Sequence, residues 1–122
     1  MNKKVKILLV EDEAIVAQYL SLELELEGYE VCGYVATGEE AIQKALEEKP
    51  DLILMDINIL GDIDGIQAAE EILKHRYIPI IFMTGYSKLE FTSRAQKLNP
   101  LGYFNKPVEV ETLAPLIDKT FA

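Results

Sequence analysis

The stretch that decides the fold is KILLVEDE, residues 6–13, in which a continuous apolar run ends abruptly in three carboxylates. Continuous apolar runs of this length are typical of strands that are buried on both faces of a parallel sheet. Similar short runs recur along the chain. The five strands that we expect are Val5 to Val10, Glu30 to Ala36, Leu52 to Met55, Ile78 to Met83 and Gly102 to Phe104.

Segments with the spacing of amphipathic helices separate these strands. Thr37 with Glu40, and Ser87 with Glu90, fit the capping box in which a hydroxyl and a carboxylate bind the free N–H groups at a helix start. The chain therefore alternates strand and helix five times. This order predicts an α/β fold, a doubly wound parallel sheet with right-handed crossovers and helices on both faces.

Composition and charge exclude several classes of protein. Of the 122 residues, 49% are apolar, which is too many for a disordered chain, and no apolar run approaches the roughly 20 residues that span a bilayer. The formal net charge of -9 disfavours direct nucleic-acid binding. Cys32 stands alone and no signal peptide is recognisable, so we expect a cytoplasmic protein with one domain over residues 1–122.

Carboxylates follow two strands that are neighbours in the strand order 2-1-3-4-5. Glu11 and Asp12 come after the first strand, and Asp56 comes after the third. Ligands of such sheets bind beyond the carboxyl ends of the strands, where these side chains would meet and repel one another unless a cation lay between them. No His or Cys lies beside them in the sequence, so an all-oxygen site for Mg²⁺ is expected rather than a zinc site.

Two further polar side chains follow the remaining strands at the same edge. Thr84 comes after the fourth strand and Lys106 after the fifth, and both side chains are able to hold phosphoryl oxygens. Taken singly, each has an ordinary structural interpretation, as a capping hydroxyl or as a surface charge. Together with the three carboxylates they predict a site for a hard cation and a phosphoryl group.

The motifs as they stand resemble those of the response-regulator receiver domain. They are ILLVEDE, LILMDINI with the following DGI, IIFMTGYS and GYFNKP, and the resemblance covers essentially the whole chain. It implies a flavodoxin-like (βα)5 receiver fold with strand order 2-1-3-4-5. It also implies that Asp56 accepts a phosphoryl group from a phosphohistidine on a sensor histidine kinase or a histidine phosphotransfer protein. The protein would then be a signalling domain that catalyses its own phosphotransfer and slow dephosphorylation, and not an enzyme.

The same resemblance implies a ligand set for Mg²⁺ as the only cofactor. Asp12 and Asp56 would bind the ion directly, Glu11 would bind it through water, and the Asn58 backbone carbonyl would complete the protein ligands. In such a site the metal and the neighbouring donors align and neutralise the transferred group.

The remaining site residues are implied to bind the phosphoryl group and to report its arrival. Lys106 would contact the phosphoryl group, Thr84 would hydrogen-bond it, and the peptide bond between Lys106 and Pro107 would be cis. Tyr103 stands where the family has an aromatic residue that turns inward when the Thr hydroxyl moves to the phosphate. The alternative is that Tyr103 is simply a half-buried tyrosine of an edge strand. The switched face would comprise the fourth helix, fifth strand and fifth helix, and would serve an attached output domain, a separate effector or a homodimer.

The chain departs from the common pattern after Asp56. The stretch INILGDIDGI is longer and more acidic than usual, so either Asp62 or Asp64 approaches the metal or Asp64 caps the third helix. Gly85 is small, as access to the phosphate requires. A tyrosine at position 86 predicts an aspartyl phosphate that outlives those of receivers with a carboxylate there.

Three other functions fit the fold class less well. A phosphorylation-independent docking module would not need the full set of site residues. A flavodoxin-like redox protein would need a hydroxyl- and glycine-rich phosphate loop where Glu11 and Asp12 stand. A phosphatase of the aspartyl-phosphate type would carry a second Asp where Asn58 stands. The cognate kinase, the process regulated, the oligomeric state and any further domains are left open by the sequence.

Overall fold

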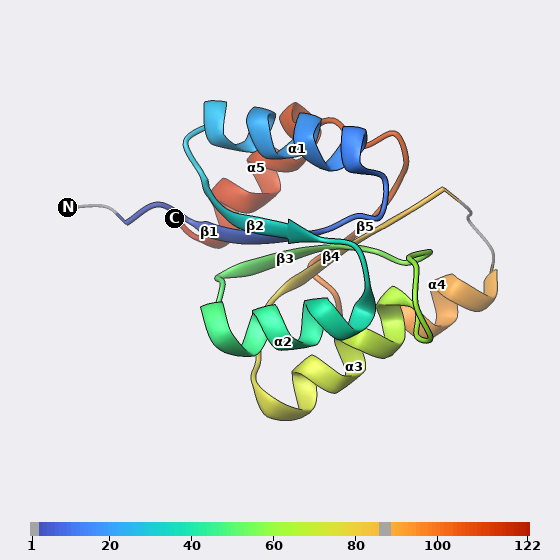
Figure 1. Cartoon of the computed structure of the whole chain (residues 1–122). Coiled ribbons are helices and arrows are strands. Elements are labelled where there is room, and N and C mark those ends of the chain that lie inside the picture. Colours follow the sequence, from blue (N-terminus) through green and yellow to red (C-terminus); the bar gives the residue numbers. More distant parts are fainter. Residues whose placement is uncertain (1–2, 86–88) are drawn as a thin grey trace.

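The computed structural model describes residues 3–85 and 89–122 (Figure 1). Strands and helices alternate throughout, as expected. The elements are β1 (Lys6–Val10), α1 (Ala14–Leu26), β2 (Glu30–Val35), α2 (Gly38–Glu48), β3 (Leu52–Asp56), α3 (Gly65–His75), β4 (Ile80–Thr84), α4 (Leu89–Gln96), β5 (Gly102–Asn105) and α5 (Val110–Thr120). Within the described part of the chain, no helix has the length and apolar character needed to cross a bilayer.

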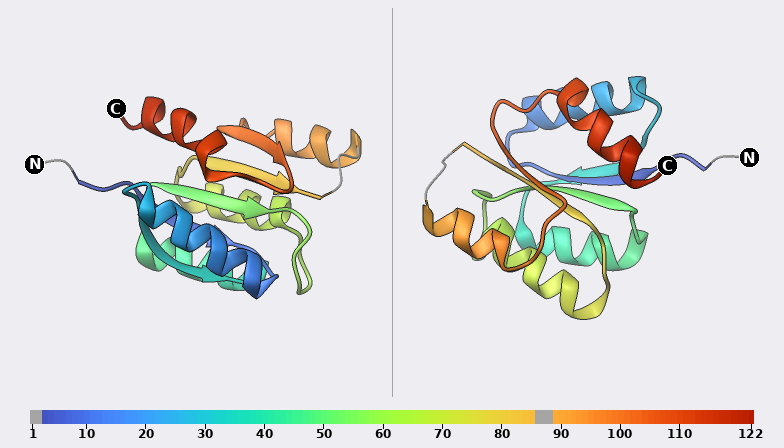
Figure 2. Two further views of the ribbon diagram at one scale, coloured as in Figure 1. Left: turned by 90° about the horizontal axis from the view of Figure 1, so that it is seen from above. Right: turned by 180° about the vertical axis from the view of Figure 1, so that it is seen from behind.

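The five strands form one parallel sheet in the order β2-β1-β3-β4-β5, which confirms the predicted topology. Figures 1 and 2 show the helices in two layers: α1 and α5 cover one face of the sheet, and α2, α3 and α4 cover the other. The fold is therefore the doubly wound α/β fold of the flavodoxin-like class.

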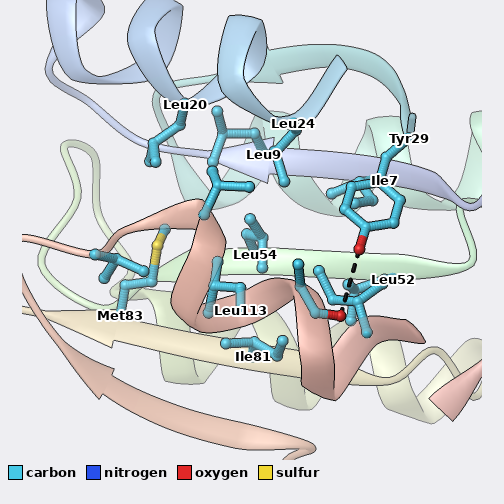
Figure 3. Packing of buried hydrophobic residues seen from close by; sticks show 14 of the residues in the cluster. Ile7, Leu9, Leu20, Leu24, Tyr29, Leu52, Leu54, Ile81, Met83 and Leu113 are labelled. Atoms are coloured by element: carbon cyan, nitrogen blue, oxygen red, sulfur yellow. Dashed lines mark hydrogen bonds between the residues drawn. The ribbon is translucent and has the colours of Figure 1, made fainter. Parts of the chain in front are cut away.

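Each central strand contributes to two separate hydrophobic cores. Successive side chains of a strand point to opposite faces, so Ile7 and Leu9 of β1 pack toward α1 and α5, whereas Leu8 and Val10 pack toward α2 and α3. Figure 3 shows the first of these cores, where the Tyr29 hydroxyl also donates to the Ala114 carbonyl at 3.4 Å. This division explains why the central strands carry apolar residues at consecutive positions.

Helix ends follow the expected chemistry where they are described. Thr37 accepts a hydrogen bond from the Glu40 amide at 3.1 Å and caps α2. Gly28 follows α1 with φ +100°, a conformation that glycine adopts without steric cost. The predicted capping box of Ser87 and Glu90 lies outside the described residues, because position 87 is not among them.

Strand boundaries differ from the prediction by one or two residues. β4 begins at Ile80 rather than at Ile78, since Pro79 has no N–H group to donate to a neighbouring strand. β3, β4 and β5 each continue one residue further than expected, to Asp56, Thr84 and Asn105. These polar residues are thus held by the sheet itself, at the edge where its strands end.

Candidate functional site

Three carboxylates gather at the carboxyl ends of β1 and β3. Glu11, Asp12 and Asp56 each offer an oxygen, and these oxygens lie within 4.8 Å of one another. Glu11 is 1% exposed and Asp56 is 2% exposed, whereas Asp12 is half-buried. The structure therefore brings together the three acids that the strand-end argument predicted.

Lys106 reaches this cluster from the loop after β5. Its Nζ lies 2.7 Å from Oδ2 of Asp56 and 2.6 Å from Oε1 of Glu11. The peptide bond between Lys106 and Pro107 is cis, as the resemblance implied. Among the residues that the structure describes, one ammonium group thus faces three carboxylates, which gives this group an excess of negative charge when all of them are ionised.

The pKa values of the cluster reflect burial and this excess charge. Burial, with a further contribution from Glu11, raises the pKa of Asp56 to about 6, although Lys106 opposes the rise. Burial and the neighbouring Glu11 also raise the pKa of Asp12. Burial lowers the pKa of Lys106, but its bonds to Asp56 and Glu11 outweigh this effect and raise it. The site favours uptake of positive charge, whether as protons or as a cation.

Asn58 and Thr84 complete the surroundings of Asp56. The Asn58 amide donates to Oδ1 of Asp56 at 3.2 Å, and its side-chain Nδ2 lies 3.5 Å from Oγ1 of Thr84. Thr84 is fully buried at the end of β4. The two oxygens of Asp56 are therefore engaged differently, one by a backbone amide and the other by Lys106.

A hollow of about 270 Å³ opens on this cluster. Its walls are formed by Asp12, Glu13, Asp56, Asn58, Gly85 and Lys106. A Cβ atom built on Gly85 would meet nothing within 4 Å, so this side of the hollow is open. Carboxylate oxygens are suitable ligands for Mg²⁺, and the ammonium of Lys106 suits an anionic group beside it. Among the residues lining the hollow, sequence reasoning assigned no role to Glu13.

The longer loop after Asp56 does not add a ligand to the cluster. Asp64 caps α3, where its side chain accepts from the Gln67 amide at 2.8 Å, so the capping alternative is the one the structure bears out. Neither Asp62 nor Asp64 belongs to the acidic cluster found among the described residues. The prediction made for position 86 lies outside those residues.

Tyr103 lies on β5, away from the residues that line the hollow. Its side chain is half-buried and packs against the core on the side of α2, α3 and α4. Within the described part of the chain, the buried Tyr103 hydroxyl has no hydrogen-bond partner. The aromatic ring is thus part of the packing beneath α4.

Comparison with known families identifies the chain. A model of the response regulator receiver domain matches residues 7–118. The chain belongs to the receiver domain family. Receiver domains are signalling domains of two-component systems, in which response regulators interact with histidine kinases and output domains, and they generally bind Mg²⁺ at an acidic pocket.

Curated relatives of this receiver domain are longer proteins. The transcriptional regulatory protein PdtaR of Mycobacterium tuberculosis is 37% identical over 113 residues, which cover 93% of this chain and 55% of the relative. A protein-glutamate methylesterase/protein-glutamine glutaminase of Carboxydothermus hydrogenoformans is 37% identical over 107 residues, 85% of this chain and 30% of the relative. The receiver domain thus spans about half the length or less of these relatives.

Solved structures share the fold along nearly the whole receiver domain. The signal receiver domain of a modulated diguanylate cyclase from Desulfovibrio desulfuricans has a TM-score of 0.90 and 37% identity, covering 98% of this chain and 94% of that one. A CheY-like receiver domain protein from Methanospirillum hungatei also has a TM-score of 0.90, with 31% identity and the same shares of the two chains.

Proposed function

We propose that this receiver domain accepts a phosphoryl group on Asp56. The observation that carries the proposal is the position of the Asp56 carboxylate, which Lys106 holds beside the acids that follow β1, with an open hollow in front of it. A phosphohistidine would be the donor. One bond forms between a carboxylate oxygen and phosphorus while the bond between phosphorus and the imidazole nitrogen breaks, and the imidazole takes up a proton.

The donor set suits Mg²⁺ as the resident cation. Asp12 and Asp56 would bind it directly, the Asn58 carbonyl would be a third protein ligand, and Glu11 would act through water. The ion would neutralise charge on the transferred group. The raised pKa values of Asp56 and Asp12 support this assignment, because burial and the neighbouring Glu11 disfavour their ionised forms and a bound cation would favour them.

Lys106 and Thr84 would serve the phosphoryl group. Lys106 already holds one oxygen of Asp56 and would turn its remaining donors to the new phosphoryl oxygens. Thr84, at the end of the neighbouring strand, would donate its hydroxyl. Phosphoryl transfer requires alignment and charge neutralisation above all, and both are supplied by groups fixed at strand ends.

Occupation of Asp56 would be reported on the face of α4, β5 and α5. Movement of the Thr84 hydroxyl toward the phosphoryl group would favour a different packing of Tyr103, whose buried hydroxyl has no hydrogen-bond partner among the described residues. The face would then bind an output domain, a separate effector or a second copy of the domain. Ligand binding of this kind shifts the balance between two existing arrangements.

An apolar hollow beside α1 is a candidate docking place for the donor protein, either a sensor histidine kinase or a histidine phosphotransfer protein. It has a volume of about 530 Å³ and shares Glu13 and Lys106 with the site. Ile15 and Tyr19 line it and are largely exposed. A partner that binds here would reach the hollow that contains Asp56.

We also propose that the protein acts in the cytoplasm and that residues 1–122 form one receiver domain.

The test is phosphorylation with acetyl phosphate and Mg²⁺, followed by intact mass. The expected gain is about 80 Da, the mass of one phosphoryl group. Asp56→Asn should lose this gain, and Asp62→Asn, which removes a neighbouring exposed carboxylate, should keep it. A mass gain that persists in Asp56→Asn would refute the assignment. A wild-type protein that stays unmodified while still binding its partners would favour the phosphorylation-independent docking module.

A further inference from the structure

Helix α4 has fewer fully buried residues than any other helix of the described fold. It has eight residues, of which Ala95 alone is fully buried. Phe91 and the nearby Leu98 are half-buried against the core, and Leu89 at the helix start is 81% exposed. With so little buried apolar surface, a well-placed polar contact makes a large difference to the position of this helix.

Such a contact joins α4 to the first turn of α3. The Arg94 guanidinium holds the Asp64 carboxylate through two bonds, from Nη1 to Oδ2 at 2.8 Å and from Nη2 to Oδ1 at 3.2 Å. Both side chains are partly buried. Two parallel bonds of this kind fix orientation as well as distance. The same Asp64 carboxylate accepts a hydrogen bond from the Gln67 amide at the start of α3, so it links Arg94 to the backbone of that helix.

The same turn of α3 rests on the backbone of Asp56. The Gly65 amide donates to the Ile57 carbonyl at 2.8 Å. A Cβ atom on Gly65 would overlap the Asp56 carbonyl oxygen and would lie 2.9 Å from Cα of Ile57, so the two backbones are in direct contact. A shift of the Asp56–Ile57 backbone would therefore displace Gly65 and, with it, the adjoining Asp64 that Arg94 binds.

Other carboxylates also act on the guanidinium of Arg94. Asp64, and with smaller effect Glu70 of α3 and Glu90 one turn earlier on α4, raise the pKa of the Arg94 guanidinium. The guanidinium thus lies among three carboxylates, of which Asp64 holds it directly through two hydrogen bonds.

We propose, on the basis of the proposed phosphoacceptor role of Asp56, that Arg94 is a positioning residue that couples the Asp56 backbone to α4 through Asp64 and Gly65. This route does not pass through Thr84 or Tyr103. In this proposal the pair is stronger while Lys106 holds Oδ2 of Asp56 at 2.7 Å, and a phosphoryl group on Asp56 moves the backbone on which Gly65 and the adjoining Asp64 rest. Occupation of Asp56 then loosens the pair and releases α4.

The test uses Mg²⁺ with beryllofluoride, which mimics the phosphoryl group, and backbone amide NMR of the whole chain. In the wild type, the amides of Ile57 and Asn58 and those of Phe91 to Ala95 should shift together on titration. In Arg94→Gln, the shifts at Ile57 and Asn58 should remain while those of α4 fall to less than half. The apparent beryllofluoride affinity should rise about three- to fivefold, the range of one ion pair at a partly exposed site.

Matched variants separate coupling from loss of structure. Asp64→Asn keeps an N-cap but removes the charge, so it should reproduce the effect of Arg94→Gln, and the double variant should be no stronger than either single one. Arg94→Lys should restore part of the α4 response. Lys97→Gln, which removes a charge from an exposed position just after α4, should behave as wild type. Should Arg94→Gln fold poorly, Asp64→Asn and Arg94→Lys carry the same test.

Three outcomes have distinct meanings. Full α4 shifts in both Arg94→Gln and Asp64→Asn, with unchanged affinity, would overturn the coupling role while leaving the function of Asp56 intact. Absence of shifts at Ile57 and Asn58 in the wild type would instead refute the proposed occupation of Asp56. Additive effects of the two single variants would likewise contradict the coupling, because residues acting through one contact are not additive.

Discussion

The Nζ atom of Lys106 lies 2.7 Å from Oδ2 of Asp56, and this contact joins the loop after β5 to the end of β3. It places the ammonium of Lys106 on the carboxylate that we propose as the phosphoacceptor. The bond offsets part of the cost of burying Asp56 but not all of it, since the pKa of Asp56 is still raised to about 6. Several expectations depend on this balance.

Replacement of Lys106 by methionine should raise the pKa of Asp56 above 6. Lys106 lowers that pKa through its hydrogen bond and its charge, so its removal leaves burial and Glu11 unopposed. Carboxyl carbon NMR across a pH titration without Mg²⁺ measures the change. Phosphorylation by acetyl phosphate should also slow by about a hundredfold, a common effect of losing one donor to a developing charge. Lys97→Met, at an exposed position, should change neither quantity.

The stability of the metal-free protein should depend on pH through Asp56. Because the folded pKa of about 6 lies above the ordinary value of 3.8, the folded state keeps a proton between these limits that the unfolded chain releases. The free energy of unfolding therefore decreases as pH rises from about 4 to about 6, and then levels off. Asp12, whose pKa is also raised, acts in the same direction.

Asp56→Asn removes the larger part of this dependence. Its stability relative to wild type should be smallest at pH 4 and should increase up to pH 7, because asparagine is neutral throughout. Urea unfolding at pH 4, 5, 6 and 7 in the presence of a chelator makes the comparison. A relative stability that is flat over this range, or that falls with pH, is incompatible with the raised pKa.

Mg²⁺ should stabilise the protein, and Asp12 should be needed for the effect. A ligand present at 100 times its Kd adds about 2.7 kcal/mol to the free energy of unfolding. Thermal unfolding with and without saturating Mg²⁺ should show such a gain in wild type and little of it in Asp12→Asn. Asp51→Asn, an exposed carboxylate outside the cluster, is the control. Equal stabilisation of Asp12→Asn would remove this residue from the metal site.

Gly65→Ala should destabilise the fold. The added methyl group would meet the Asp56 carbonyl oxygen and Cα of Ile57, which are backbone atoms that yield only if α3 moves. Overpacking of this kind costs about 1–3 kcal/mol. Gly85→Ala is a matched control, because a Cβ there meets nothing within 4 Å. The comparison is made by urea unfolding, and equal stability of the two variants would show that α3 does not rest on Asp56 as described.

A larger side chain at position 85 should impair access without disturbing the fold. Gly85→Leu places its side chain at the open wall of the hollow that contains Asp56. Its thermal stability should stay close to that of wild type, whereas its rate of phosphorylation by acetyl phosphate should fall by about tenfold or more, since small misplacements of a donor are costly. An unchanged rate would mean that the donor enters by another path.

The sequence predicts most of the architecture and the acidic cluster for one physical reason. Apolar residues at consecutive positions indicate strands buried on both faces, parallel strands end at the same edge, and the residues after them must meet there. Glu11, Asp56 and Lys106 follow from this rule. The rule is less exact for strand boundaries. The apolar run of the fourth strand begins at Ile78, but the strand itself begins at Ile80, after Pro79.

The contact of Arg94 with Asp64 was beyond such reasoning. The two residues are 30 positions apart, on helices whose mutual placement depends on how both pack against the sheet. No periodic pattern indicates which surface arginine meets which carboxylate. Asp64 was predictable as a helix cap, because capping is local. The second role of the same carboxylate depends on tertiary structure alone.

The sheet also works as a partition. The side chains of α1 pack into one core and those of α4 pack into the other, and the strands between them belong to both. Under the proposed function, a donor protein seated beside α1 would contact one layer of helices, whereas α4 packs in the other layer.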